Sequence, residues 1–289
     1  MKTINCNNGW YLGLGDLVCF AWLATGARAE GEEVRLFATG WRAEVLRLLG
    51  IEPTDDPEGS IISEGGFEDA RAAGEEIFYL EAMRREFGIA SAPRRPLVDL
   101  GTEEKSFHLH ERTVLLFPHT NGPSRQWPAA YWIDLAHLLQ ERGLHPAIVL
   151  QQPDPRFEGR VPCWIAQLSC RELFAQIAEA ELVIGSDSGP AHVAGALGVK
   201  TLVLAGPTGS PTFAHLPHVQ VLHRDSPECS GCYYRGEDYR RACEVGCGEL
   251  FALSPYRVLG AALRIIGPTA PSVLSTIPNN PPATRRKKK

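Results

Sequence analysis

The sequence contains no long apolar run. None of its 289 residues belongs to a stretch that approaches the roughly 20 uninterrupted apolar residues of a membrane-spanning helix. The opening residues 1–6 include a lysine but no apolar segment after it, so we expect no secretory signal peptide. With 44% hydrophobic and 22% charged residues, the composition is typical of a globular protein, and a cytoplasmic location is expected.

An excess of basic residues is also missing. The formal net charge is −5, whereas a general nucleic-acid binder usually carries a positive excess, so we expect no nucleic-acid partner. Basic residues do fill positions 285–289, after a stretch rich in proline and asparagine, and residues 269–289 are therefore expected to be a disordered tail. Such a tail is compatible with peripheral contact with the inner membrane, although a solvated tail is the simpler interpretation.

The first glycine-rich loop lacks one glycine of the dinucleotide-binding fingerprint. A strand near residues 3–6, this loop and a following apolar helix together predict a Rossmann-like opening. However, Val18 stands where the fingerprint needs its third glycine after Gly13 and Gly15. Because Asp16 would also repel a pyrophosphate, we do not expect a dehydrogenase.

The most informative stretch runs from residue 181 to residue 208. Its apolar residues 182–184 predict a buried parallel strand, which ends in a turn-forming loop. A helix is expected from Pro190, and a second strand over residues 201–204. Ligands of such sheets bind at the carboxyl ends of the strands, and the free N–H groups of a helix that begins there favour an anion.

The side chains of this loop suit a sugar that is joined to a phosphate. Asp187 can accept hydrogen bonds from hydroxyl groups, Ser188 and Gly189 precede the expected helix amides, and His192 lies one turn further on, facing the same side. The alternative is that Asp187 only caps the helix and that His192 only packs.

As a block, this stretch resembles a family signature. The residues Asp187-Ser188-Gly189, His192 and then Gly206-Pro207-Thr208 are similar to the D-[TS]-G-x-x-H…G-P-T motif of glycosyltransferase family 9, the bacterial heptosyltransferases. The resemblance implies an α/β, GT-B-like fold, in which two Rossmann-like domains face each other across a cleft. It also implies that Asp187, Ser188, Gly189 and His192 bind a nucleotide-sugar donor.

Two further motifs are similar to the same family. Arg125-Gln126-Trp127-Pro128 fits the motif [KR]-x-W-P, whose basic residue binds the donor phosphate, and the small-residue loop before it contains Thr120. Gly15-Asp16 matches a G-D pair whose aspartate acts as the catalytic base. As alternatives, Arg125 would only face solvent beside a packed Trp127, and Asp16 would only favour the helix dipole.

The resemblance also implies two domains, and the sequence differs from the family in two places. We expect an acceptor-side domain over residues 1–111, shorter than usual in the family, and a nucleotide-sugar-binding domain over residues 112–268. The glutamate that contacts the nucleotide ribose in the family has no match here. Gln151, Asp154 or Glu158 could replace it.

Four of the eight cysteines fall close together, with the spacing C-x2-C-x10-C-x3-C. Because this segment, residues 229–247, has few aliphatic residues, a tetrahedral metal site would supply the folding energy that it lacks. The resemblance implies Zn or Fe without choosing between them. Four reduced cysteines in an insertion are the alternative. These residues are Cys229, Cys232, Cys243 and Cys247.

The sequence as a whole therefore predicts an inverting glycosyltransferase that needs no catalytic metal. By resemblance, Asp16 activates an acceptor hydroxyl and heptose is moved from ADP-heptose to a lipopolysaccharide core sugar, another glycan, a lipid-linked acceptor or a protein. Two alternatives remain open: a transferase or epimerase for another nucleotide sugar, and a non-catalytic module that assembles into a homo-oligomer.

Overall fold

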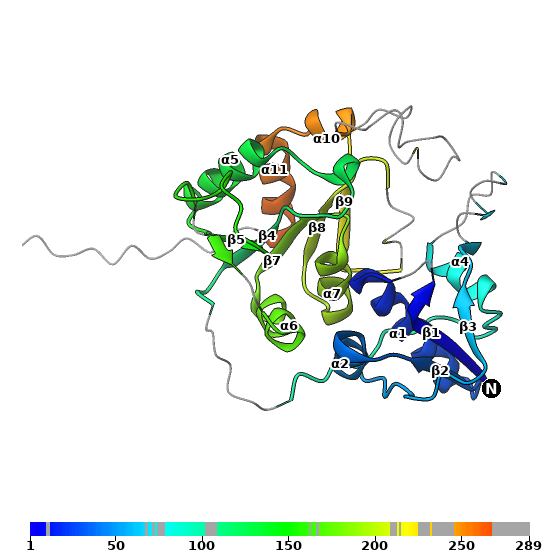
Figure 1. Ribbon diagram of the computed structural model, residues 1–289. Coiled ribbons are helices and arrows are strands. Elements are labelled where there is room, and N and C mark those ends of the chain that lie inside the picture. Colours follow the sequence, from blue (N-terminus) through cyan, green and yellow to red (C-terminus); the bar gives the residue numbers. More distant parts are fainter. Residues whose placement is uncertain are drawn as a thin grey trace, which may run out of the picture.

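The computed structural model contains two parallel sheets with helices packed against them (Figure 1). The strands of the first sheet lie before residue 64 and those of the second lie after residue 112. The structure describes residues 1–9, 12–66, 69–70, 73, 79–101, 109–161, 163–165, 168–208, 213, 215–224, 232 and 246–267.

The first sheet has three described strands in the order β2-β1-β3. Its first strand is longer than the predicted residues 3–6, and the sequence does not predict β3, which is short and has two exposed isoleucines at its centre. No described helix is both long and apolar enough to cross a membrane. The elements are β1 (Lys2–Gly9), α1 (Leu14–Ala29), β2 (Val34–Phe37), α2 (Gly40–Leu48), β3 (Ser60–Ser63) and α4 (Tyr79–Glu86).

The second sheet has six described strands in the order β6-β5-β4-β7-β8-β9, and every neighbouring pair is parallel. Its central strands are buried at every position because helices cover both faces. The elements are β4 (Thr113–Phe117), η1 (Pro123–Arg125), α5 (Ala129–Gln140), β5 (His145–Leu150), β6 (Cys163–Ile165), α6 (Cys170–Glu179), β7 (Leu182–Ser186), α7 (Gly189–Leu197), β8 (Thr201–Leu204), β9 (Val219–Leu222), α10 (Gly248–Phe251) and α11 (Pro255–Ile266).

Strand β7 continues two residues beyond its predicted end. Gly185 pairs with Phe117 of β4, and Ser186 pairs with Leu204 of β8, so both belong to the ladder rather than to a turn. The turn prediction fails here because pairing with strands on both sides overrides the local preference of glycine and serine. The loop that follows the strand therefore begins at Asp187.

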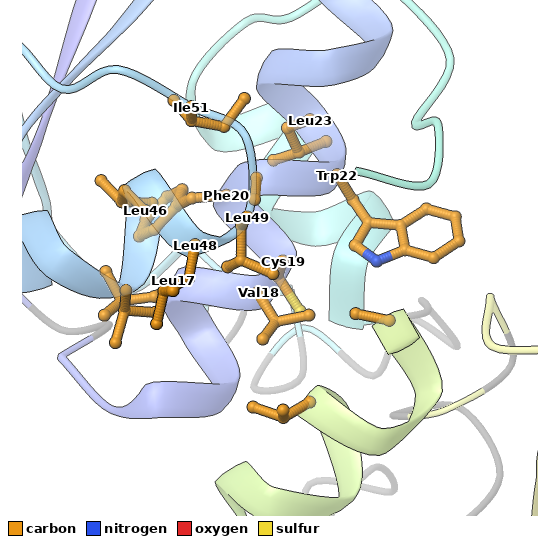
Figure 2. Packing of buried hydrophobic residues seen from close by; sticks show 14 of the residues in the cluster. Leu17, Val18, Cys19, Phe20, Trp22, Leu23, Leu46, Leu48, Leu49 and Ile51 are labelled. Carbon is orange, nitrogen blue, oxygen red and sulfur yellow. The ribbon is translucent and has the colours of Figure 1, made fainter. Parts of the chain in front are cut away.

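The two faces of the second sheet belong to different apolar cores. On β4, Leu115 and Phe117 join a core that also contains α1, α2, β2 and α7, whereas Val114 and Leu116 join a core with α5 and α11. Figure 2 shows part of the first core, where apolar side chains of α1 lie against those of α2 and its C-terminal end. The first sheet therefore shares its core with one face of the second.

Helices α1 and α7 approach each other closely at their N-terminal ends, where each has a glycine. A Cβ atom on Gly189 would lie 2.7 Å from Cβ of Leu14, and a Cβ atom on Gly15 would lie 2.8 Å from Cδ2 of His192. Both distances are too short for a real side chain, so glycine permits this contact. It brings two of the predicted motifs together.

Candidate active site

The start of α7 forms one side of the candidate site. Ser188 occupies the N-cap position with an extended backbone, but its hydroxyl donates to the carbonyl of Ser186 at 3.2 Å and does not cap the helix. Ser188 therefore occupies the N-cap position without capping α7 through its side chain. An uncapped N-terminus leaves amide groups that favour an anion.

Arg125 and Asp187 lie together beside this helix start. Nη1 of Arg125 donates to the backbone carbonyl of Asp187 at 3.0 Å and lies 3.6 Å from Oδ2 of the same residue. The Asp187 side chain is only 7% exposed, while that of Arg125 is 31% exposed. The guanidinium thus keeps donors that face solvent, next to the helix N-terminus.

Asp16 lies at the start of α1 with both carboxylate oxygens bound. Oδ2 accepts from the amide of Gly13 at 2.8 Å, and Oδ1 accepts from the hydroxyl of Tyr79. Burial raises the pKa of Asp16, and the nearby charge of Asp187 raises it further, whereas Tyr79, Gly13 and Arg125 act in the opposite direction. Asp16, Asp187 and Arg125 therefore lie close enough for their charges to interact.

Tyr79 is a site residue that the sequence does not indicate. It lies at the N-terminal end of α4, 63 residues after the aspartate that it contacts. Its only local signal is its position beside the apolar face of an amphipathic helix, which does not distinguish it from a packing residue.

His192 is buried where α1 and α7 meet. Its side chain is 4% exposed, its ring centroid lies 4.6 Å from that of Phe213, and it packs on Gly15. Burial, together with the charge of Arg125, lowers the pKa of His192 to about 4. The contact between α1 and α7 encloses the ring of His192, and its role in binding the donor stays a prediction.

The loop that carries Arg125 is held by Thr120 and by a buried tryptophan. The Thr120 hydroxyl accepts a hydrogen bond from the amide of Gly122 at 3.3 Å. The backbone carbonyl of Thr120 accepts one from the side chain of Gln126 at 3.2 Å. Nε1 of Trp127 donates to the carbonyl of Leu253 at 2.9 Å. The loop is therefore anchored on both sides of Arg125.

The three candidates for a ribose contact differ in their surroundings. Gln151 and Glu158 are exposed. Asp154 is bound by His119 at 3.0 Å and by Arg156 at 2.6 Å, and these contacts hold the pKa of its carboxyl well below the usual range. Asp154 is therefore already paired with two side chains.

The predicted four-cysteine site falls largely outside the described residues. Cys229 and Cys243 are not among them, while Cys232 and Cys247 are described and buried. A Cβ atom on Gly206 would lie 2.9 Å from Sγ of Cys247. This end of the cysteine-rich segment thus packs against the loop after β8.

Comparisons with known proteins agree with these motifs. The family model of glycosyltransferase family 9 (heptosyltransferase) matches residues 78–239. Lipopolysaccharide heptosyltransferase 1 of Pseudomonas aeruginosa is 33% identical over an alignment of 127 residues, and the match covers 41% of this chain and 36% of that protein. The match therefore spans about a third of the length of this curated relative.

Solved structures with similar folds include two from E. coli. The ADP-heptose lps heptosyltransferase II has a TM-score of 0.60 at 14% identity, with 92% of this chain and 98% of that chain covered. The iron-containing dodecameric glycosyltransferase TibC from enterotoxigenic E. coli H10407 has a TM-score of 0.66 at 14% identity, with 91% and 78% covered. The predicted α/β, GT-B-like fold is confirmed.

Proposed function

Because the chain belongs to glycosyltransferase family 9, we propose that it is an inverting glycosyltransferase that moves a sugar from a nucleotide-diphosphate donor to an acceptor hydroxyl. The observation that carries this proposal is the meeting of Asp16, Arg125 and Asp187 at the N-terminal ends of α1 and α7. A partly buried carboxylate beside a helix N-terminus, whose free amides favour an anion, supports the proposal.

The chemistry of the proposed transfer needs one base and one anion site. The acceptor oxygen forms a bond to the anomeric carbon while its proton passes to the carboxylate of Asp16. The bond between that carbon and the diphosphate breaks, and its electron pair leaves with the diphosphate. Arg125 and the amides at Gly189 stabilise the negative charge that develops there.

The donor would lie against Asp187, Ser188 and the loop at Thr120. The Asp187 carboxylate can accept from sugar hydroxyls, and its 3.6 Å separation from Arg125 keeps the sugar site beside the phosphate site. We propose heptose as the sugar and ADP-heptose as the donor, because relatives with these names match the chain in sequence and in fold. The acceptor would be a hydroxyl of a lipopolysaccharide core or of a protein.

We also propose that Cys229, Cys232, Cys243 and Cys247 hold a structural Zn or Fe ion. The spacing of the four thiols supports this, as does the burial of Cys232 and Cys247. The similar structure of TibC is described as iron-containing. The ion would stabilise this segment and take no part in the transfer.

The donor can be identified by calorimetric titration of the protein with ADP-heptose, GDP-mannose and UDP-glucose. We expect ADP-heptose to bind and Arg125→Ala to weaken that binding by about 10- to 150-fold, which is the effect of losing a charged hydrogen bond. The exposed Arg142→Ala variant is the matched control and should bind as the wild type does. If a different nucleotide sugar binds, that sugar replaces ADP-heptose as the proposed donor. If none of the three binds, a non-catalytic module is favoured.

A further inference from the structure

Three side chains that can bind a metal ion lie together beside the candidate active site. Cys19 comes from α1, His192 from α7, and His215 from the segment between β8 and β9. Each offers one ligand atom, and these three atoms all lie within 4.8 Å of one another. Figure 2 shows Cys19 on the side of α1 that faces α7. None of these residues belongs to the four-cysteine segment.

Two nitrogen atoms of this cluster are buried without a partner. Neither Nδ1 of His192 nor Nε2 of His215 has a hydrogen-bond partner among the residues that the structure describes. Buried polar atoms in proteins are nearly always paired, so each unpaired atom needs an explanation. Two unpaired nitrogens in a cluster that also contains a thiol favour ligand binding over packing alone.

The charges around the cluster favour a cation. A neutral imidazole keeps a lone pair on one ring nitrogen, so His192 and His215 can each supply one ligand atom. The negative charges of Asp16 and Asp187 both act on the thiol of Cys19, and they would attract a positive ion there. Arg125 is the opposing charge, and it acts on His192.

We propose that Cys19, His192 and His215 bind one Zn²⁺ ion, which joins α1 to α7 and to the segment after β8. Zn²⁺ favours thiolate sulfur and imidazole nitrogen in tetrahedral sites, and three protein ligands leave the fourth position to water. Such ligands lie roughly 3.3 to 3.8 Å apart, so small side-chain rotations bring these three into place. On binding, the Cys19 thiol loses its proton to solvent, and its sulfur donates to the ion.

The ion would fix the two helices that carry the candidate active site. Cys19 lies about one helical turn after Asp16 on α1, and His192 lies in the helix that begins just after Asp187. A metal bond between these helices would hold the two aspartates at a constant separation. The proposal does not depend on the sugar, on the acceptor or on catalysis itself.

Packing alone makes a different prediction for one substitution. His215 lies edge-on to Trp22, with ring centroids 5.2 Å apart, and His192 lies against Phe213. His215→Phe keeps an aromatic ring at this place and removes the unpaired nitrogen, so the fold should be retained. If the cluster only packs, this variant should respond to zinc as the wild type does.

The test counts bound metal and measures thermal unfolding. Each protein is treated with a chelator, given excess Zn²⁺ and desalted, and zinc per chain is then measured by mass spectrometry. We expect His215→Phe and Cys19→Ala each to bind one zinc fewer per chain than the wild type. We also expect the zinc-dependent rise in the unfolding midpoint to become smaller in both variants. Zinc held by the four-cysteine segment contributes equally to every protein in this comparison.

Cys170→Ala is the matched control, because Cys170 is a partly buried cysteine on α6 outside the cluster. It should keep the zinc content of the wild type. The proposal is overturned if both His215→Phe and Cys19→Ala keep the full zinc content and midpoint shift. It is also overturned if the wild type binds no more zinc than these variants do.

Discussion

Asp16 is a carboxylate that is fixed before any substrate arrives. The amide of Gly13 and the hydroxyl of Tyr79 each bind one of its oxygens. Asp16→Asn keeps the shape of the side chain but cannot accept the proton, so kcat should fall by about 10²- to 10⁴-fold. Donor affinity, measured by calorimetry, should stay unchanged. The exposed Asp56→Asn variant serves as the control. Activity within about threefold of the wild type would contradict the role of Asp16 as base.

The hydrogen bond from Tyr79 predicts a change in pH dependence. This bond stabilises the charged form of Asp16 and lowers its pKa, which burial otherwise raises. A base must be deprotonated, so activity is lost as the pH falls through this pKa. Tyr79→Phe should therefore move the acidic limb of the kcat profile to higher pH. Tyr256→Phe, at a tyrosine that is 71% exposed, should leave the profile in place. If the acidic limb of the kcat profile is unchanged in Tyr79→Phe, the hydrogen bond from Tyr79 does not set the pKa of Asp16.

Single residues differ in how far the sequence predicts their roles. Arg125 and Asp187 are indicated by motifs, and the structure brings them together. Tyr79 and His215 carry no such signal, because each meets its partners only through packing between segments far apart in the chain. The inward position of His192 depends in the same way on the approach of α1 to α7.

At the scale of elements, the contact between α1 and α7 depends on Gly189. A Cβ atom there would lie 2.7 Å from Leu14, so Gly189→Ala must push the helices apart. We expect a loss of about 1 to 3 kcal/mol in the free energy of unfolding, measured by urea denaturation. Gly260→Ala on α11 is the control, because the nearest described atom to its Cβ would be Nη1 of Arg264, at an ordinary contact distance of 3.7 Å. The control should raise stability by about 0.5 to 1 kcal/mol. Equal stability changes in the two variants would argue against a tight contact.

The elements that the sequence predicts are those with strong periodicity and clear ends. Helix α11 has clear ends in the sequence, since it begins at Pro255 and Gly267 follows its last residue. Gly198, which follows α7, adopts a left-handed conformation, as glycines at helix C-termini commonly do. Strands β3, β6 and β9 are missed; each is a short strand at the edge of its sheet, whereas β8, which is equally short, lies inside its sheet and is fully buried. Their pairing comes from neighbours that are distant in the chain.

At the scale of the whole molecule, one apolar core serves both sheets. It combines Leu36 of β2 and most of α1 with Leu115, Val183 and Val203 of the second sheet. The division at residue 111 stays a prediction, since this core includes residues from both sides of it. A shared core means that exposing one sheet would also expose apolar surface of the other.

The shared core predicts that the two sheets unfold together. Heating should give one calorimetric peak, with equal calorimetric and van't Hoff enthalpies. Leu36→Ala in the first sheet and Leu116→Ala in the second both remove a buried leucine, and each should cost about 2 to 5 kcal/mol. Both variants should move the same single peak to lower temperature. Two peaks, with each variant moving a different one, would show that the sheets fold independently and that the contact between α1 and α7 does not couple them.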